Sequence, residues 1–292
     1  MIFIKKIRYI PAVCTLFFLL YSGVTGQGAD KGLRPGMTHI RISVSAPSAS
    51  IEETVPVDIY VPDCSVIRGD VLVLPGWKFS RDRWYRETDL LRFADSRGFR
   101  LIFPEMNITL YESSYFEETT LKWAAVPGGQ WIRDVMIPFL RENHGLLMEK
   151  KRNYLLGLST GGRGVALVHL QNPGIFTAGA ALSGDFDQVR MPGDRLMARV
   201  YGAFSIRGER WETVDNPRHE VEKGNWSMPI YIGHGKKDGV VPFDQSVRFF
   251  QVLKKNCPDL HVVFSDPDNA GHDFAYWGSE IESVFEFFDN VK

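Results

Sequence analysis

The hexapeptide Gly157-Leu158-Ser159-Thr160-Gly161-Gly162 is the strongest indication of the fold in this sequence. It follows the apolar residues 154–156, which are typical of a buried strand, and opens the apolar helical stretch 160–171. Glycines two residues on either side of Ser159 let the chain turn sharply without Cβ clashes, so that the serine Oγ projects clear of the sheet. A serine in an ordinary glycine-rich turn is the alternative, but the strand, turn and helix around the motif favour a nucleophile elbow.

Short apolar runs of the same kind recur along the chain and alternate with helical stretches. Continuous apolar runs indicate strands that helices cover on both faces, and their alternation with helices indicates a parallel, doubly wound sheet. The predicted strands of this kind lie at 71–74, 101–103, 154–156, 178–182, 230–232 and 261–264. The predicted helices lie at 83–97, 130–143, 160–171, 244–256 and 279–290.

The part of the chain before residue 71 has a different pattern. In 37–44 and 55–61 apolar residues alternate with polar ones, which predicts two antiparallel strands at one edge of the sheet. The predicted fold class is therefore α/β, with a mostly parallel, doubly wound sheet and an antiparallel N-terminal edge.

The first 26 residues predict a targeting signal and no part of the fold. Lys5, Lys6 and Arg8 stand in a segment without acids, and residues 9–21 are almost wholly apolar. The apolar run is shorter than the roughly 20 residues of a spanning helix, so a signal peptide cleaved near 24–26 is expected, with an uncleaved anchor as the alternative. We therefore expect an exported protein, periplasmic or secreted.

Length and composition predict a single domain over residues 27–292. The chain of 292 residues is 44% hydrophobic and 24% charged, close to the average of globular proteins. Its net charge is −1 and its cations are scattered, which argues against nucleic acid as a partner. Cys64 and Cys257 could form a disulfide after export, but a core of this size does not need one, and we expect both thiols to be free.

Two connections, 107–129 and 185–227, are longer than is usual between strands and helices. Both leave the carboxyl ends of strands, where open α/β sheets bind ligands, so we expect these two insertions to form the walls of a substrate cleft. Aromatic side chains in and beside them either line that cleft or pack the insertions onto the body of the protein. These are Tyr111, Tyr115, Phe116, Trp123, Trp131, Tyr201, Phe204 and Trp211.

A serine nucleophile needs a base and an acid that orients it. Asp238 follows the predicted strand 230–232, and His272 follows the strand 261–264. The chain order Ser159, Asp238, His272 is that of α/β-hydrolases. His272 is therefore the predicted general base, and Asp238 the group that holds its tautomer and stabilises the imidazolium.

Other residues compete for these two roles. Asp185, next to Asp187, ends the strand after the elbow and is the reserve candidate for the acid. His234 precedes Asp238 in the same loop and is expected to be structural or to support the site, while Asp273 adjoins His272 and is expected to point elsewhere. The remaining histidines show no metal-ligand spacing, so no metal or other cofactor is expected. These are His39, His144, His169, His219 and His261.

A tetrahedral intermediate needs two backbone N–H donors. Thr160, directly after the nucleophile, is expected to supply one. The other should come from the loop after strand 71–74, where Leu74-Pro75-Gly76-Trp77 places Trp77 N–H behind a glycine that permits close approach.

The segment Gly271-His272-Asp273-Phe274-Ala275-Tyr276-Trp277 resembles the Gly-His-Asp-Trp-x-x-Trp segment of the esterase D family. The motifs 157–162 and 233–238 are also similar, and the resemblance runs over about 69–292. It implies the α/β-hydrolase fold and hydrolysis of carboxylic esters by Ser159, Asp238 and His272. Feruloyl esterases and S-formylglutathione hydrolases belong to that family, whose substrates vary widely. Leu74-Pro75-Gly76-Trp77 departs from the family's commoner Leu-His-Gly or Leu-Asp-Gly.

The sequence thus predicts a serine hydrolase that cleaves a small-molecule or carbohydrate-linked carboxylic ester through an acyl-enzyme. A serine peptidase of the prolyl-oligopeptidase type shares the same motifs, although 27–292 leaves no room for the propeller that usually gates such enzymes. An acyltransferase on the same fold is a further alternative. A non-catalytic binding protein is disfavoured because all three triad positions are intact.

Overall fold

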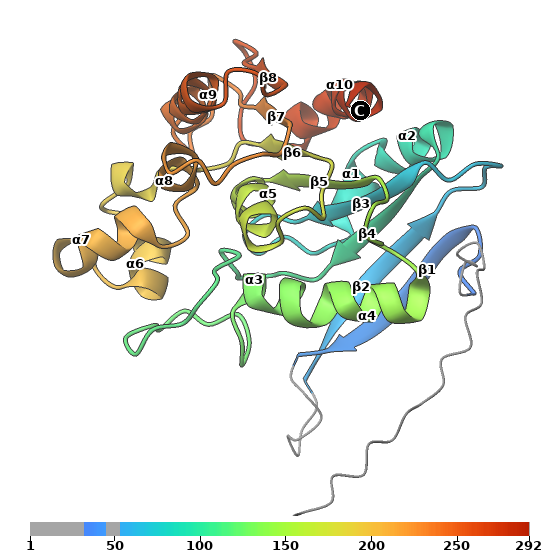
Figure 1. The fold of residues 1–292 in the computed structure, drawn as a ribbon, viewed down its shortest axis with the longest axis horizontal. Coiled ribbons are helices and arrows are strands. Elements are labelled where there is room, and N and C mark those ends of the chain that lie inside the picture. Colours follow the sequence, from blue (N-terminus) through green and yellow to red (C-terminus); the bar gives the residue numbers. More distant parts are fainter. Residues whose placement is uncertain (1–31, 45–52, 292) are drawn as a thin grey trace, which may run out of the picture.

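The computed structural model describes residues 32–44 and 53–291 (Figure 1). The predicted signal peptide, residues 1–26, therefore lies outside the described residues. Within the two described segments, no helix is long and apolar enough to cross a membrane.

One sheet of eight strands runs through the molecule in the order β1-β2-β4-β3-β5-β6-β7-β8 (Figure 1). The strands are β1 Gly36–Ser43, β2 Thr54–Val61, β3 Gly69–Leu74, β4 Phe99–Pro104, β5 Asn153–Leu158, β6 Ala178–Leu182, β7 Ile230–Gly233 and β8 Val262–Ser265. From β4 to β8 all neighbours are parallel, whereas β2 runs antiparallel to both β1 and β4. The predicted mostly parallel sheet with an antiparallel N-terminal edge is confirmed.

Helices cover both faces of the sheet, because successive residues of each inner strand point to opposite sides. The α-helices are α1 Arg83–Glu87, α2 Leu90–Arg97, α3 Gly128–Trp131, α4 Ile137–His144, α5 Thr160–Gln171, α6 Arg195–Tyr201, α7 Phe204–Thr213, α8 Pro217–Glu222, α9 Asp244–Asn256 and α10 Phe274–Asn290. Along β3, Val71 and Val73 pack with α1, α2 and α10, while Leu72 and Leu74 pack with α4, α5 and α9. A π-helical stretch, Ile132–Met136, joins α3 to α4, and Gln188–Arg190 form a 3-10 turn.

Three helices differ from their predicted bounds, and that predicted over 130–143 is α3, the π-helical stretch and α4. The single helix predicted over 83–97 is two helices, because Thr88 is extended and its hydroxyl donates to Trp84 O at 2.5 Å while accepting from Leu90 N–H at 3.3 Å. Helix α10 begins five residues before the predicted 279, since the Asp273 carboxylate accepts the Tyr276 N–H at 2.9 Å and caps it. The cap places α10 directly behind His272.

The two insertions pack against each other through a third apolar cluster. Thr119 Oγ1 donates to Val200 O at 2.7 Å, and Arg207 and Arg210 both pair with Glu118. The buried members of the cluster are Leu110, Leu121, Met197, Val200, Tyr201 and Trp211. The side chain of Trp77, next to the elbow, packs on the same cluster, so both insertions are anchored close to the carboxyl end of β3.

The close packing of β5 on α5 generates a stability prediction. A Cβ at Gly157 would lie 2.1 Å from Gly161 O, whereas a Cβ at Gly193 would meet nothing within 4 Å. Gly157→Ala should therefore destabilise the protein by about 2 kcal/mol or more, and Gly193→Ala by less than about 0.5 kcal/mol. Urea unfolding of the purified variants measures both. Equal midpoints for the two variants would contradict the packing described here.

Candidate active site

Ser159 lies at the tip of the turn between β5 and α5 in a strained backbone conformation. Its φ of 53° and ψ of −123° are unusual for a residue with a Cβ. Two contacts hold the turn: Ser159 N–H donates to Leu182 O at 2.8 Å, and Arg163 N–H donates to Ser159 O at 3.1 Å. The side chain is directed away from the sheet by a backbone that neighbouring strands fix.

His272 and Asp238 complete a chain of hydrogen bonds with Ser159. His272 Nε2 lies 3.0 Å from Ser159 Oγ, and His272 Nδ1 lies 2.7 Å from Asp238 Oδ2. The imidazole stands edge-on to the Trp277 ring, with centroids 5.0 Å apart and an interplanar angle of 84°. The three residues follow β5, β7 and β8, so the parallel sheet brings their loops to one edge. We call them the Ser-His-Asp chain below.

The Asp238 carboxylate is enclosed by hydrogen-bond donors. Its Oδ1 accepts the backbone N–H groups of Val240 at 2.8 Å and Val241 at 2.9 Å. Its Oδ2 faces His272 Nδ1 and, at 3.3 Å, His234 Nε2. Burial opposes ionisation, but hydrogen bonds from His234, His272 and Val240 outweigh it and hold the pKa of Asp238 well below its usual range. Asp238 is therefore an anion at any ordinary assay pH.

Asp185, the reserve candidate for the acid, has a different partner. It pairs at 2.8 Å with Arg163, whose side chain is wholly buried on α5. Burial disfavours the charge of Arg163, but the carboxyl groups of Asp185 and Asp215 nearby raise the pKa of this guanidinium. Arg163 also donates to Gln188 Oε1, so it ties the elbow helix to the second insertion.

Sequence reasoning missed the role of Arg163. The available signal was a single charged residue in the otherwise uncharged stretch 160–168, directly after the two glycines of the elbow. A buried arginine needs an anionic partner. This requirement would have predicted that Asp185 pairs with Arg163 and not with His272.

The two segments expected to supply the oxyanion donors both adjoin Ser159. Thr160 is the first residue of α5, where a backbone N–H has no partner within the helix. The loop before Trp77 is fixed by two side chains: Trp84 Nε1 donates to Leu74 O at 3.2 Å, and Tyr111 Oη donates to Pro75 O at 2.8 Å. A Cβ on Gly76 would lie 3.2 Å from Ser159 Cβ, so this loop passes directly beside the serine.

Comparison with protein families shows where the chain belongs. Its residues 96–292 match the model of the prolyl oligopeptidase family. The chain belongs to the prolyl oligopeptidase family. It is accordingly a serine hydrolase, and the matched region holds all three residues of the Ser-His-Asp chain. Among curated proteins no sequence matches the chain.

Solved structures share the fold of this prolyl oligopeptidase family member at low identity. An S-formylglutathione hydrolase from Staphylococcus aureus is 19% identical with a TM-score of 0.65, the match covering 87% of this chain and 99% of that chain. One from Agrobacterium tumefaciens is 14% identical with a TM-score of 0.69, covering 88% and 95%. Acylaminoacyl peptidase from Pyrococcus horikoshii is 18% identical with a TM-score of 0.65, covering 87% and 41%. The α/β-hydrolase fold and, at the level of fold, the resemblance to the esterase D family are confirmed.

Four of the aromatic side chains in and beside the two insertions are buried in the protein. Tyr111, Trp131, Tyr201 and Trp211 have 0% relative exposure, so they cannot line an open cleft. Their polar atoms are also engaged inside the protein, for example Trp211 Nε1 with Gly202 O at 2.8 Å. Of the two interpretations of these rings, packing holds for these four.

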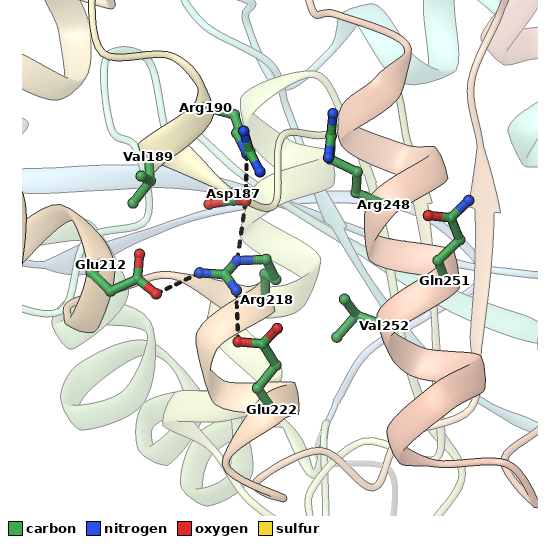
Figure 2. Close-up of a pocket in the computed structure, with 9 residues that line it drawn as sticks. All are labelled: Asp187, Val189, Arg190, Glu212, Arg218, Glu222, Arg248, Gln251 and Val252. Carbon is green, nitrogen blue, oxygen red and sulfur yellow. Dashed lines mark hydrogen bonds and ion pairs between the residues drawn. The ribbon is translucent and has the colours of Figure 1, made fainter.

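A cavity of about 390 Å³ lies between the second insertion and α9 (Figure 2). Arg218 stands at its centre and pairs with Asp187 at 3.0 Å, Glu212 at 2.5 Å and Glu222 at 2.6 Å. No residue of the Ser-His-Asp chain lines it. Its carboxylates neutralise an internal arginine, which holds α7 and α8 to the loop after β6.

The two cysteines in the described part of the chain do not belong to the Ser-His-Asp chain. Cys64 and Cys257 are free thiols, with Sγ atoms 3.3 Å from Val66 O and 3.7 Å from Trp226 O. In residues 32–44 and 53–291, no three or more His, Cys, Asp and Glu side chains gather to hold a metal ion.

Substitution of Asp238 and substitution of Asp185 should have opposite effects, the first on activity and the second on stability. Asp238→Asn should lower kcat by about 10⁴-fold, because an amide presents the wrong partner to His272 Nδ1, with little change in stability. Asp185→Asn should keep the kcat of the folded protein within about tenfold but cost about 3 kcal/mol of stability, because it removes the anionic partner of a buried arginine. Ester kinetics and urea unfolding on the same preparations measure both effects. An exchange of the two phenotypes would make Asp185 the acid.

Proposed function

We propose that this chain hydrolyses carboxylic esters through a Ser159, His272, Asp238 triad and an acyl-enzyme. The observation that carries the proposal is the unbroken hydrogen-bonded path from Ser159 Oγ through both imidazole nitrogens to a buried carboxylate. An isolated serine hydroxyl is a weak nucleophile, and a base within hydrogen-bond reach, itself oriented by an acid, activates it.

The proposed acylation follows from this arrangement. As Ser159 Oγ attacks the ester carbonyl carbon, its proton passes to His272 Nε2. The N–H groups of Thr160 and Trp77 stabilise the oxyanion, helped by the positive end of α5. His272 then donates the proton to the departing alcohol oxygen, the carbon–oxygen bond breaks, and the acyl group remains on Ser159.

Deacylation repeats the sequence with water. His272 takes a proton from water as the water oxygen attacks the acyl carbon, and it returns that proton to Ser159 Oγ when the acid leaves. Asp238 stays ionised throughout and stabilises each imidazolium. The structure supports this assignment because the carboxylate accepts bonds from both Val240 and Val241 N–H and is anchored before substrate binds.

The substrate class rests on the structural neighbours. S-formylglutathione hydrolases, which by name cleave an S-acyl compound, match almost along their whole length, and this favours a small acyl group. The predicted ester of a small molecule or a sugar remains part of the proposal. The predicted signal peptide places the reaction in the periplasm or outside the cell. The two insertions would form the walls of the cleft, because both leave the strand ends that carry the site.

Peptide hydrolysis is the second candidate. The match to the prolyl oligopeptidase family and the fold shared with acylaminoacyl peptidase favour it. The same Ser-His-Asp chain serves either reaction, and the difference lies in whether the leaving group is an alcohol or an amine. A p-nitrophenyl ester and a p-nitroanilide with the same acyl group separate the two candidates.

Serine substitution tests the nucleophile. Ser159→Ala should reduce ester turnover by roughly a million-fold and abolish labelling by a fluorophosphonate. Ser183→Ala is the matched control, since Ser183 also stands at a strand end with positive φ but is wholly buried, with Trp277 Nε1 donating to its Oγ at 3.2 Å. Mass spectrometry locates the label. A label on Ser183, or hydrolysis that survives Ser159→Ala, would refute the assignment.

Substitution of Trp77 tests the second oxyanion donor. Trp77→Pro removes the N–H and should lower kcat by about 10²- to 10³-fold, whereas Trp77→Phe keeps the N–H and should stay within about tenfold. The side chain packs on the third apolar cluster, so thermal unfolding is measured alongside the steady-state kinetics. If the proline variant folds and turns over as fast as the phenylalanine variant, the donor lies elsewhere.

A further inference from the structure

We propose that His234 is a positioning residue that holds the Asp238 carboxylate in the orientation required by His272. The inference rests on the proposed function and assigns a role within it. His234 follows β7, is 0% exposed, and contacts both Asp238 and Ser246 of helix α9. Its Nε2 faces Asp238 Oδ2, the same carboxylate oxygen that faces Nδ1 of the proposed base, His272.

Both ring nitrogens of His234 have partners. Nε2 lies 3.3 Å from Asp238 Oδ2 and 3.1 Å from Val241 O, and Nδ1 lies 2.7 Å from Ser246 Oγ on α9. The Phe243 ring stands edge-on to the imidazole, with centroids 5.7 Å apart and an interplanar angle of 85°. The ring is therefore held in one orientation.

The partners determine the tautomer. Two oxygen acceptors face Nε2, so Nε2 carries a proton and donates, while the Ser246 hydroxyl is the hydrogen-bond partner of Nδ1. In this state the ring directs an N–H towards Asp238. Ser246, which is also fully buried, holds α9 to the loop that contains Asp238.

The role of His234 follows from the donors around the two oxygens of the Asp238 carboxylate. The N–H groups of Val240 and Val241 hold Oδ1, whereas on Oδ2 only side chains donate, one from His272 and one from His234. His272 Nδ1–H keeps its bond to Oδ2 during the proposed reaction, but His272 is the ring that the carboxylate has to orient. His234 therefore holds Oδ2 independently of His272. Without it, the carboxylate plane is fixed from one side only, and the imidazole that it orients becomes less well aligned.

Two conservative variants test this role. The amide nitrogen of glutamine occupies the position of a histidine Nε2, and that of asparagine the position of Nδ1. His234→Gln keeps a donor towards Asp238, so its kcat should stay within about threefold of the wild type. His234→Asn keeps a polar group near Ser246 but none near Asp238, so its kcat should fall about 10- to 100-fold, the effect of losing a hydrogen bond to a charged group.

Three further measurements separate positioning from a general structural effect. KM should be unchanged in both variants, and the rate of inactivation by a fluorophosphonate should fall in parallel with kcat, because it reports activation of Ser159 alone. His169→Asn is the matched control: His169 is also buried, packs on the Trp226 ring at 4.8 Å between centroids, and has an Nδ1 without a partner in the described structure. Its kcat should equal that of the wild type.

The outcomes distinguish this inference from the proposed function. If the wild type neither hydrolyses esters nor reacts with the fluorophosphonate, the proposed function fails. If the wild type is active and the glutamine and asparagine variants have equal kcat, or if His169→Asn loses as much activity as His234→Asn, positioning by His234 is wrong. Glutamine rescue together with an impaired asparagine variant supports it.

Discussion

The close approach of the first turn of α5 to the carboxyl ends of three strands is the constraint on which the site depends. A Cβ on Gly161 would lie 2.3 Å from Leu74 O of β3, and one on Gly162 would lie 2.6 Å from Leu182 O of β6. Only glycine fits such contacts. They press the helix onto the sheet, and Ser159, at the junction, is left with the positive φ that directs its side chain outwards.

The same packing determines where charge can be buried. Arg163 lies one turn beyond the elbow and is wholly buried, so it requires an anion, which Asp185 supplies from the end of β6. Asp238 lies in the neighbouring connection after β7, and its partners are two backbone N–H groups and two imidazole nitrogens. Two aspartates in similar chain positions thus have different environments, one neutralising a structural arginine and the other orienting an imidazole.

The periphery of the molecule supports the site through packing. Trp277 and the Asp273 cap place α10 behind His272. The two insertions are joined by their own apolar cluster, onto which Trp77 packs. Arg218 pairs with three carboxylates, which hold α7 and α8 to the loop after β6 (Figure 2).

The sequence by itself determined the strands, the elbow, and the chain order of Ser159, Asp238 and His272, because hydrophobic periodicity and glycine placement act over a few residues. It did not predict that the helix over 83–97 divides into α1 and α2 at Thr88, because that division depends on the hydrogen bonds of the Thr88 hydroxyl. From chain order the sequence favours Asp238 over Asp185 as the partner of His272, but β6 and β7 are adjacent, with Leu182 paired to Gly233, so both loops reach the same edge. The partners of the two aspartates are visible only in the folded chain, because they come from distant parts of the sequence: Arg163 pairs with Asp185, and His272 with Asp238.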